Sequence, residues 1–262
     1  GAETAAAAAR RAVLLAARQD PAGLAASAVE EQLWRYGYYK RIDALRRAAA
    51  AKGAALARQQ QHQHQQRAAT GALLHFLDSS MDQYKALLEV VRGAGGQRLS
   101  VYRCCLYLGD LARYREQYEE RPRKSWDAAE AHYRAALDAD PRQGSPHNQL
   151  AVLAGYARRH CVALYHYVRS IHAAVPFPTA RQNLGLLFET VHKEARKREH
   201  LLAAARTAAA PMTSRQRTEL LSGLCFRFAY LHATLALADD AKPLRAVCDP
   251  LVARYEAELA VL

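Results

Sequence analysis

The residues of this chain that could do chemistry are cationic side chains in two segments, and the chemistry they suit is the binding of an anion. Lys40 and Arg47 are seven residues apart, which is two turns of an α-helix, so they share one face of a predicted helix. Arg113 precedes Tyr114 in a second segment with a helical pattern. A bound phosphate needs several converging cations on rigid elements, at least one of them the planar fork of an arginine.

The same arginines have a plainer interpretation as surface ion pairs. Arg47 follows Asp43 by four residues, and Arg113 follows Asp110 by three; both spacings bring side chains together on a helix. Such pairs contribute about 0–1 kcal/mol when they are exposed. Spacing alone favours this interpretation. Arg115 is expected to be solvated or to join two helices.

Length, charge and cysteine content narrow the class of protein. The chain has 262 residues, of which 51% are apolar and 24% charged, and this excludes a disordered chain, a collagen or a small disulfide scaffold. Its formal charge of +12 favours an anionic partner such as a nucleic acid, a phosphorylated protein or an acidic tail. The five cysteines include no C-x-x-C pair, so we expect free thiols in a reducing compartment, with no metal and no cofactor. No membrane partner is expected, because the apolar runs are too short to span a bilayer.

The hydrophobic pattern is helical along nearly the whole chain, so the predicted fold class is all-α. Strong helix formers such as Ala, Leu, Arg, Gln and Glu dominate the sequence, and almost no segment alternates as a strand would. The pattern predicts helices near residues 3–18, 26–51, 72–92, 213–237 and 241–259. The glutamine-rich tract of residues 59–66 is either a loop or an extension of a helix.

A 34-residue period runs through the middle of the chain. Leu150 and Leu184 are 34 residues apart, and Leu108 precedes Leu150 by 42, which is the period plus an insert of 8 within residues 116–124. Other pairs at the same spacing are Ala129 with Ala163, Tyr133 with Tyr167, and Ala136 with Ser170. A helix–turn–helix period of this length is the tetratricopeptide pattern, in which small residues let paired helices approach closely. We therefore expect a tetratricopeptide domain over residues 1–205, with repeats at about 103–176, and a helical-hairpin segment over 206–262 that starts a C-terminal α-helical domain.

Several phrases of the sequence are more specific than a generic repeat. They are LWRYGYYKRI from residue 33, FLDSS from 76, LYLGDLARYR from 106, AHYRAA from 131, PHNQLAVLA from 146, YHYVRS from 165 and PFP from 176. In this order they resemble the 14-3-3-like, tetratricopeptide-containing adaptors of nonsense-mediated mRNA decay, the SMG family, which includes the ever-shorter-telomeres protein. The resemblance covers residues 12–188 well, and it is strongest to the plant and algal form of the family's seventh branch.

The resemblance implies a fold and a task. The fold is a 14-3-3-like antiparallel array of helices with tetratricopeptide repeats, followed by helical hairpins. Its concave basic groove binds phosphorylated Ser or Thr in the tails of the up-frameshift RNA helicase. The adaptor links that helicase to decay and dephosphorylation factors, and it can pair with a sister SMG adaptor. Such a protein acts in the cytoplasm and can shuttle to the nucleus.

The resemblance also implies roles for individual residues. In the decay adaptors the matching lysine and the first arginine of the A-R-Y-R phrase bind the phosphate, which assigns this role to Lys40 and Arg113. The 14-3-3 pattern of a Lys, an Arg seven residues later and an Arg-Tyr pair adds Arg47 and Tyr114. Asn148 stands where the 14-3-3 fold offers a side chain to the peptide backbone.

Three other classes of function are alternatives. A nucleic-acid-binding or telomerase-associated helical protein fits the charge of +12, although the basic residues are spread over many helices and no recognised nucleic-acid motif is present. A tetratricopeptide scaffold for unmodified peptides would bind phosphorylated and plain peptides equally. An enzyme is not expected, since the sequence has no G-x-S-x-G, P-loop, H-E-x-x-H or Gly-rich dinucleotide motif.

Overall fold

The structure is a computed structural model that describes residues 2–20, 28–50, 59–93 and 97–197, together with isolated positions between 213 and 253. Within these ranges every regular element is a helix, and one isolated bridge joins Gln143 to Val175. The all-α fold class predicted from the sequence is confirmed. Of the helices described, none is both long enough and apolar enough to cross a bilayer.

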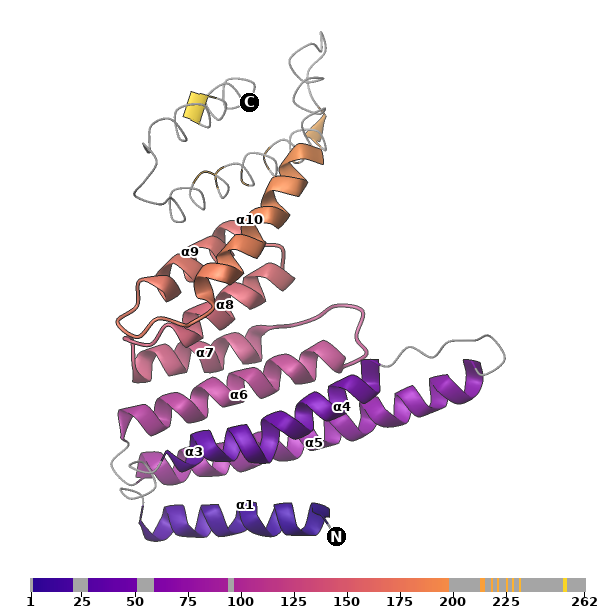
Figure 1. Cartoon of the computed structure of the whole chain (residues 1–262), viewed down its shortest axis with the longest axis vertical. Coiled ribbons are helices and arrows are strands. Elements are labelled where there is room, and N and C mark those ends of the chain that lie inside the picture. Colours follow the sequence, from indigo (N-terminus) through magenta and orange to yellow (C-terminus); the bar gives the residue numbers. More distant parts are fainter. Residues whose placement is uncertain are drawn as a thin grey trace. The chain divides into compact units, whose positions relative to one another are not determined.

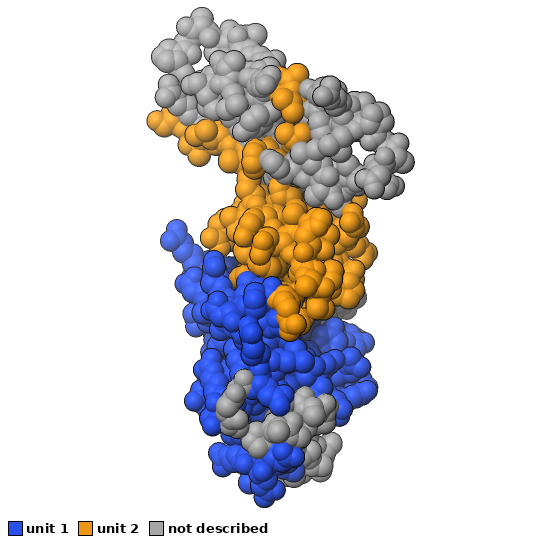
Figure 2. All heavy atoms as spheres, turned by 90° about the vertical axis from the view of Figure 1, so that its left-hand side faces the viewer, with its two compact units in different colours: residues 1–141 blue, residues 142–262 orange. Residues whose placement is uncertain are grey.

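The chain forms two compact units, residues 1–141 and residues 142–262 (Figure 2). The domain boundary expected after residue 205 falls on residues 198–212, outside the described residues. The helices expected at 213–237 and 241–259 also lie outside them, apart from single positions. These expectations therefore stay predictions.

The first unit is a stack of helical rods in which each rod packs on the next (Figure 1). Its elements are α1 (Ala2–Gln19), α3 (Val29–Gln32), the π-helical segment η1 (Leu33–Tyr39), α4 (Lys40–Ala50), α5 (Gln59–Gly93), α6 (Arg98–Tyr118) and α7 (Asp127–Ala139). Helix α5 packs against both α4 and α6, and α6 packs in turn against α7. Buried Tyr and Leu side chains such as Tyr38, Leu77, Tyr84, Leu108 and Leu111 form the core.

Two details of the first unit differ from, or refine, what the sequence predicted. The helix expected at 26–51 contains the π-helical turns of η1, a wider winding that shifts the phase of the side chains. Regular α-helix resumes at Lys40, so Lys40 and Arg47 keep their shared face. The glutamine-rich tract is a helix extension, because α5 begins at Gln59, as the helix propensity of glutamine allows.

The hairpin of α6 and α7 shows why a small residue marks the repeat. A Cβ added to Gly109 of α6 would lie 2.4 Å from Cε1 of Tyr133 on α7, so only glycine lets the two helices approach this closely. The predicted insert at 116–124 falls on the end of α6 and the long connection of residues 119–126. The equivalent connection in the second unit is residues 157–159.

The second unit continues the repeat with α8 (Ser145–Tyr156), α9 (His160–Ile171) and α10 (Ala180–Lys197). Helix α9 packs against both α8 and α10. The residues that define the 34-residue period are all buried: Leu150 with Leu184, Ala129 with Ala163, Tyr133 with Tyr167, and Ala136 with Ser170. The period therefore marks equivalent core positions of successive helical hairpins.

Candidate functional site

Arg113 is a buried cation fixed by two partners in the first unit. Its side chain is on α6, and the residue is 7% exposed. Nε donates a hydrogen bond to the Tyr133 hydroxyl at 3.2 Å, and Nη2 donates to Oδ1 of Asp110 at 3.2 Å. The Tyr133 hydroxyl donates in turn to the same carboxylate oxygen at 2.8 Å. These contacts form a closed triangle that sets the direction of the guanidinium.

The triangle keeps Arg113 charged although it is buried. Burial alone lowers the pKa of Arg113, but Tyr133 and Asp110 raise it, and the net direction is upward. Burial raises the pKa of the Asp110 carboxyl, while the Arg113 charge opposes that shift. The hydrogen bonds to Tyr133 and Asp110 use two of the five N–H donors of a guanidinium, and Tyr114 is a further hydrogen-bond partner of Arg113. Arg113 is thus a rigid cation that still has N–H groups able to donate hydrogen bonds to a ligand.

The interpretation of Arg113 as half of a surface ion pair with Asp110 is correct about the partner and wrong about the exposure. Arg113 does pair with Asp110, as the spacing predicts. The pair is buried, however, because α7 covers it with Tyr133. The range of about 0–1 kcal/mol for the contribution of an ion pair to stability applies to exposed pairs, so it does not apply to this buried pair.

Lys40 and Arg47 are both exposed on α4, but they differ in their contacts. Lys40 is exposed, and its Nζ lies 5.2 Å from the ring centroid of Tyr36. Arg47 forms an ion pair with Asp43, and its side chain is 78% exposed. Arg47 therefore behaves as the surface-pair interpretation expects. Among the described contacts, none joins Lys40 or Arg47 to Arg113.

Arg46 is the residue that the sequence argument missed. Its Cζ lies 4.7 Å from the ring centroid of Tyr114, and Cζ of Arg113 lies 4.2 Å from the same centroid. Nε of Arg46 donates a 3.4 Å hydrogen bond to the Tyr118 hydroxyl. A signal was present in the sequence, since Ile42 lies four residues before Arg46 on the face of α4 that the core buries.

Tyr114 lies in the same cluster, as expected, but as a buried ring between cations. The residue is 7% exposed. Burial raises the pKa of its hydroxyl, and the positive charge of Arg113 opposes that shift. A cation over an aromatic face is attracted by the electron-rich ring. The ring therefore places the guanidinium groups of Arg46 and Arg113 in one neighbourhood.

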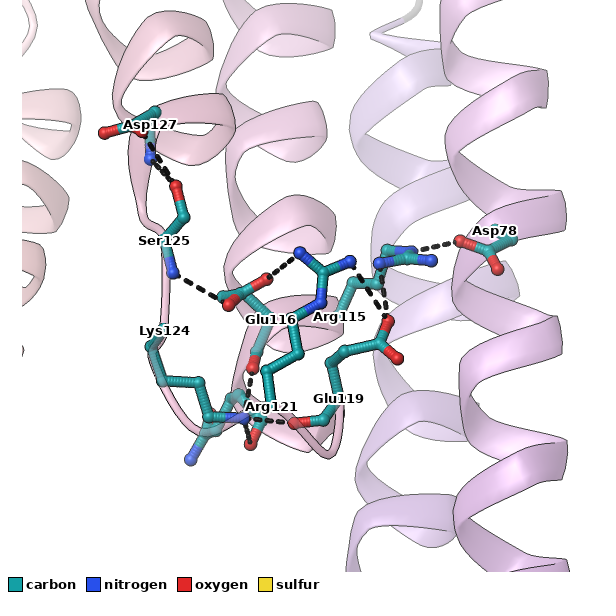
Figure 3. Close-up of polar contacts among 9 residues, drawn as sticks. Asp78, Arg115, Glu116, Glu119, Arg121, Lys124, Ser125 and Asp127 are labelled. Carbon is teal, nitrogen blue, oxygen red and sulfur yellow. Dashed lines mark hydrogen bonds and ion pairs between the residues drawn. The ribbon is translucent and has the colours of Figure 1, made fainter.

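Arg115 joins helices rather than serving the cluster (Figure 3). Its Nε pairs with Oδ1 of Asp78 on α5 at 2.6 Å, and its Nη1 with Oε2 of Glu119 at 2.8 Å. Beyond Glu119, Nζ of Lys124 donates to the carbonyl oxygen of Glu116 at 2.8 Å. The expectation of an inter-helix role for Arg115 is confirmed, and these contacts fasten the C-terminal end of α6.

Asn148 belongs to the second unit, on α8. It is buried, and its Oδ1 accepts a 2.8 Å hydrogen bond from Nδ2 of Asn183 on α10. The amide therefore ties two helices of the repeat together. Its expected contact with a peptide backbone stays a prediction.

The described part of the chain offers nothing that would hold a metal ion. It contains no group of three or more His, Cys, Asp or Glu side chains arranged as ligands. Cys104 and Cys105 are buried free thiols, and burial raises the pKa of both. Raised pKa values disfavour the thiolate, which is the reactive and metal-binding form.

The chain resembles known proteins both in its fold class and in its sequence family. Its fold is that of an all-α helical-repeat protein, and residues 129–261 match the family model described as the Est1 DNA/RNA binding domain. The chain belongs to the SMG and Est1 family, as its sequence phrases indicated.

Three relatives illustrate the match. A protein of Arabidopsis thaliana named nonsense-mediated mRNA decay factor SMG7-like is 38% identical over 164 residues, which are 62% of this chain and 18% of that protein. The nonsense-mediated mRNA decay factor SMG5 of Danio rerio is 32% identical over 164 residues, 62% of this chain and 14% of that protein. The telomerase-binding protein EST1A of Danio rerio is 36% identical over 130 residues, 50% of this chain and 8% of that protein. The chain thus spans less than a fifth of the length of each.

Proposed function

We propose that this chain is the phosphoserine- and phosphothreonine-binding part of an adaptor in nonsense-mediated mRNA decay. Its relatives include proteins named as decay factors of that pathway. The proposed partner is the phosphorylated up-frameshift RNA helicase, which the adaptor would link to decay and dephosphorylation factors. A sister adaptor is a further proposed partner, and binding rather than catalysis is the proposed activity.

The observation that carries this proposal is the fixed, charged guanidinium of Arg113. Asp110 and Tyr133 hold it by two hydrogen bonds, so little side-chain freedom is lost when a ligand binds. A phosphoserine brings about −1.5 to −2 charges and three acceptor oxygens. The unused N–H donors of Arg113 suit such oxygens, because arginine and phosphate form charge-assisted hydrogen bonds.

Lys40 supplies the second proposed charge. Among the described residues it has no carboxylate partner, and its one described contact is the exposed ring of Tyr36. An exposed ammonium with no carboxylate partner in the described part of the chain is available to an incoming phosphate. Asn148 is proposed to contact the peptide backbone, in addition to its hydrogen bond with Asn183.

The test is a calorimetric titration with two Ser-Gln peptides that differ only in phosphorylation. We expect the chain to bind the phosphorylated peptide selectively and the Lys40→Glu variant to lose that binding. Lys85→Glu is the matched control, because it makes the same change of net charge at an exposed site paired with Asp82. Equal affinity for the two peptides would contradict the proposal and favour a scaffold for unmodified peptides.

Nucleic-acid binding is the second candidate function. The matching family model carries DNA and RNA binding in its description, and the formal charge is +12. This candidate predicts binding of single-stranded RNA or DNA whose affinity falls steeply with salt. It also predicts that Lys40→Glu has no greater effect than Lys85→Glu.

A further inference from the structure

The helical segment formed by η1 and α4 contains arginines that already have carboxylate partners. Arg35 of η1 pairs with Glu31 at 3.3 Å, and Arg47 of α4 pairs with Asp43. In both pairs the carboxylate is four residues earlier on the helix, so each arginine folds back onto its own helix. An anion that approached Arg47 would have to compete with Asp43 for the guanidinium and would be repelled by that carboxylate.

Arg46 is in the opposite situation. Within the described residues it forms no ion pair, and its partners are the ring of Tyr114 and the hydroxyl of Tyr118. Burial lowers the pKa of Arg46, the hydrogen bond with Tyr118 raises it, and the net direction is upward. Among the described residues, the side chain thus remains a half-buried cation without a carboxylate partner.

Arg46 and Arg113 meet at one ring. Their Cζ atoms lie 4.7 Å and 4.2 Å from the centroid of Tyr114. The two charges interact, since the positive charge of Arg113 acts to lower the pKa of Arg46. Like charges held together in a partly buried site repel each other, and an anion bound to both would offset that repulsion.

We propose that Arg46, and not Arg47, is the second guanidinium of the phosphate-binding site, acting beside Arg113. This inference rests on the proposed function, because it names a further residue of the same site. Nε of Arg46 is engaged with Tyr118, which leaves the terminal nitrogens for two phosphate oxygens. Arg47 shares a helix face with Lys40, but it is already paired with the Asp43 carboxylate.

Adjacent arginines make a matched experiment. The affinities for the phosphorylated and plain Ser-Gln peptides are measured for Arg46→Gln and for Arg47→Gln, which change net charge equally. We expect Arg46→Gln to weaken binding of the phosphorylated peptide by roughly tenfold or more, since a hydrogen bond to a charged group is lost. Arg47→Gln should stay within about twofold of the unchanged chain, as for an exposed charge pair. Neither variant should change binding of the plain peptide.

Two further variants separate phosphate binding from packing on Tyr114. Arg46→Met keeps an aliphatic contact with the ring without the charge, and it should show the same loss as Arg46→Gln. Arg46→Lys keeps the charge without the fork and should recover part of the affinity. Thermal melting confirms that each variant is folded before its affinity is used.

The results distinguish this inference from the proposed function. If Lys40→Glu loses binding while both neutral Arg46 variants bind normally, the role of Arg46 is wrong and the phosphopeptide site stands. If Arg47→Gln causes the larger loss, the assignment is reversed. If the unchanged chain does not prefer the phosphorylated peptide, the proposed function fails and the inference fails with it.

Discussion

Two ion pairs of the same chemical kind have very different surroundings in the first unit. Asp110 with Arg113 is enclosed by α7, whereas Asp43 with Arg47 lies on the surface. A buried cation whose counter-charge is removed costs far more free energy than an exposed one. The sequence predicted both pairs from spacing, but spacing does not reveal which pair a neighbouring helix covers.

We expect Asp110→Asn to lower the free energy of unfolding by about 3 kcal/mol, because Arg113 would remain buried without its carboxylate. Asp43→Asn removes the matching exposed carboxylate and should cost less than about 1 kcal/mol. Urea unfolding followed by circular dichroism compares the two. Equal costs would mean that the triangle around Arg113 does not stabilise the fold. For the same reason Lys40, and not Arg113, is the residue to reverse in charge in binding tests.

Binding should also depend on the charge of the phosphate itself. The second pKa of a phosphoserine is about 6, so its dianion becomes a monoanion as the pH falls below that value. Arginine and lysine side chains keep their charge over this range. We expect the affinity for the phosphorylated peptide to fall several-fold between about pH 7.5 and pH 5.5. Calorimetry at the two pH values measures this affinity. An unchanged affinity would mean that the site does not distinguish the phosphate dianion from the monoanion.

At the scale of elements, the close approach of α6 and α7 positions Arg113. Gly109 lets Tyr133 come near enough to bond with both Asp110 and Arg113. The tetratricopeptide pattern predicted that small residues let paired helices approach closely, and Gly109 is such a residue. The pattern could not predict the bonds of Tyr133, because these depend on the angle between two helices.

We expect Gly109→Ala to destabilise the chain by about 1–3 kcal/mol, because the new Cβ would overlap the buried ring of Tyr133. Gly71→Ala is the control within the same unit. A Cβ at Gly71 would meet nothing within 4 Å, so alanine should stabilise α5 by up to about 1 kcal/mol. Thermal unfolding of both variants tests this. If Gly109→Ala leaves the melting temperature unchanged, α6 and α7 can move apart without loss of stability.

At the scale of the whole molecule, family membership was easier to infer from sequence than the site. Motifs such as LYLGDLARYR combine core, packing and polar positions of one hairpin, and their order along the chain indicated the family that the comparisons show. The cations that form the candidate site were harder to predict, because Arg46 and Arg47 are adjacent in the sequence and have the same side chain. Arg46 lies over the ring of Tyr114 beside Arg113, whereas Arg47 pairs with Asp43. A spacing rule does not show which of two neighbouring arginines faces a ring on another helix.

The net charge of +12 gives a prediction that does not depend on the site. If the chain also binds single-stranded RNA, we expect the affinity to fall by at least tenfold between about 0.05 M and 0.2 M salt. The phosphopeptide should be less sensitive to salt, because it bears few charges and one of its cationic partners is buried. Fluorescence anisotropy with both ligands compares them. Identical salt dependence would indicate one non-specific basic surface.

The most direct test of the account is the ratio of affinities for the phosphorylated and plain Ser-Gln peptides, measured by calorimetry for the unchanged chain and for Lys40→Glu. We expect a large ratio for the unchanged chain and a ratio near one for the variant, with Lys85→Glu close to the unchanged chain. A ratio near one for the unchanged chain would contradict the account, and so would a large ratio that survives in Lys40→Glu.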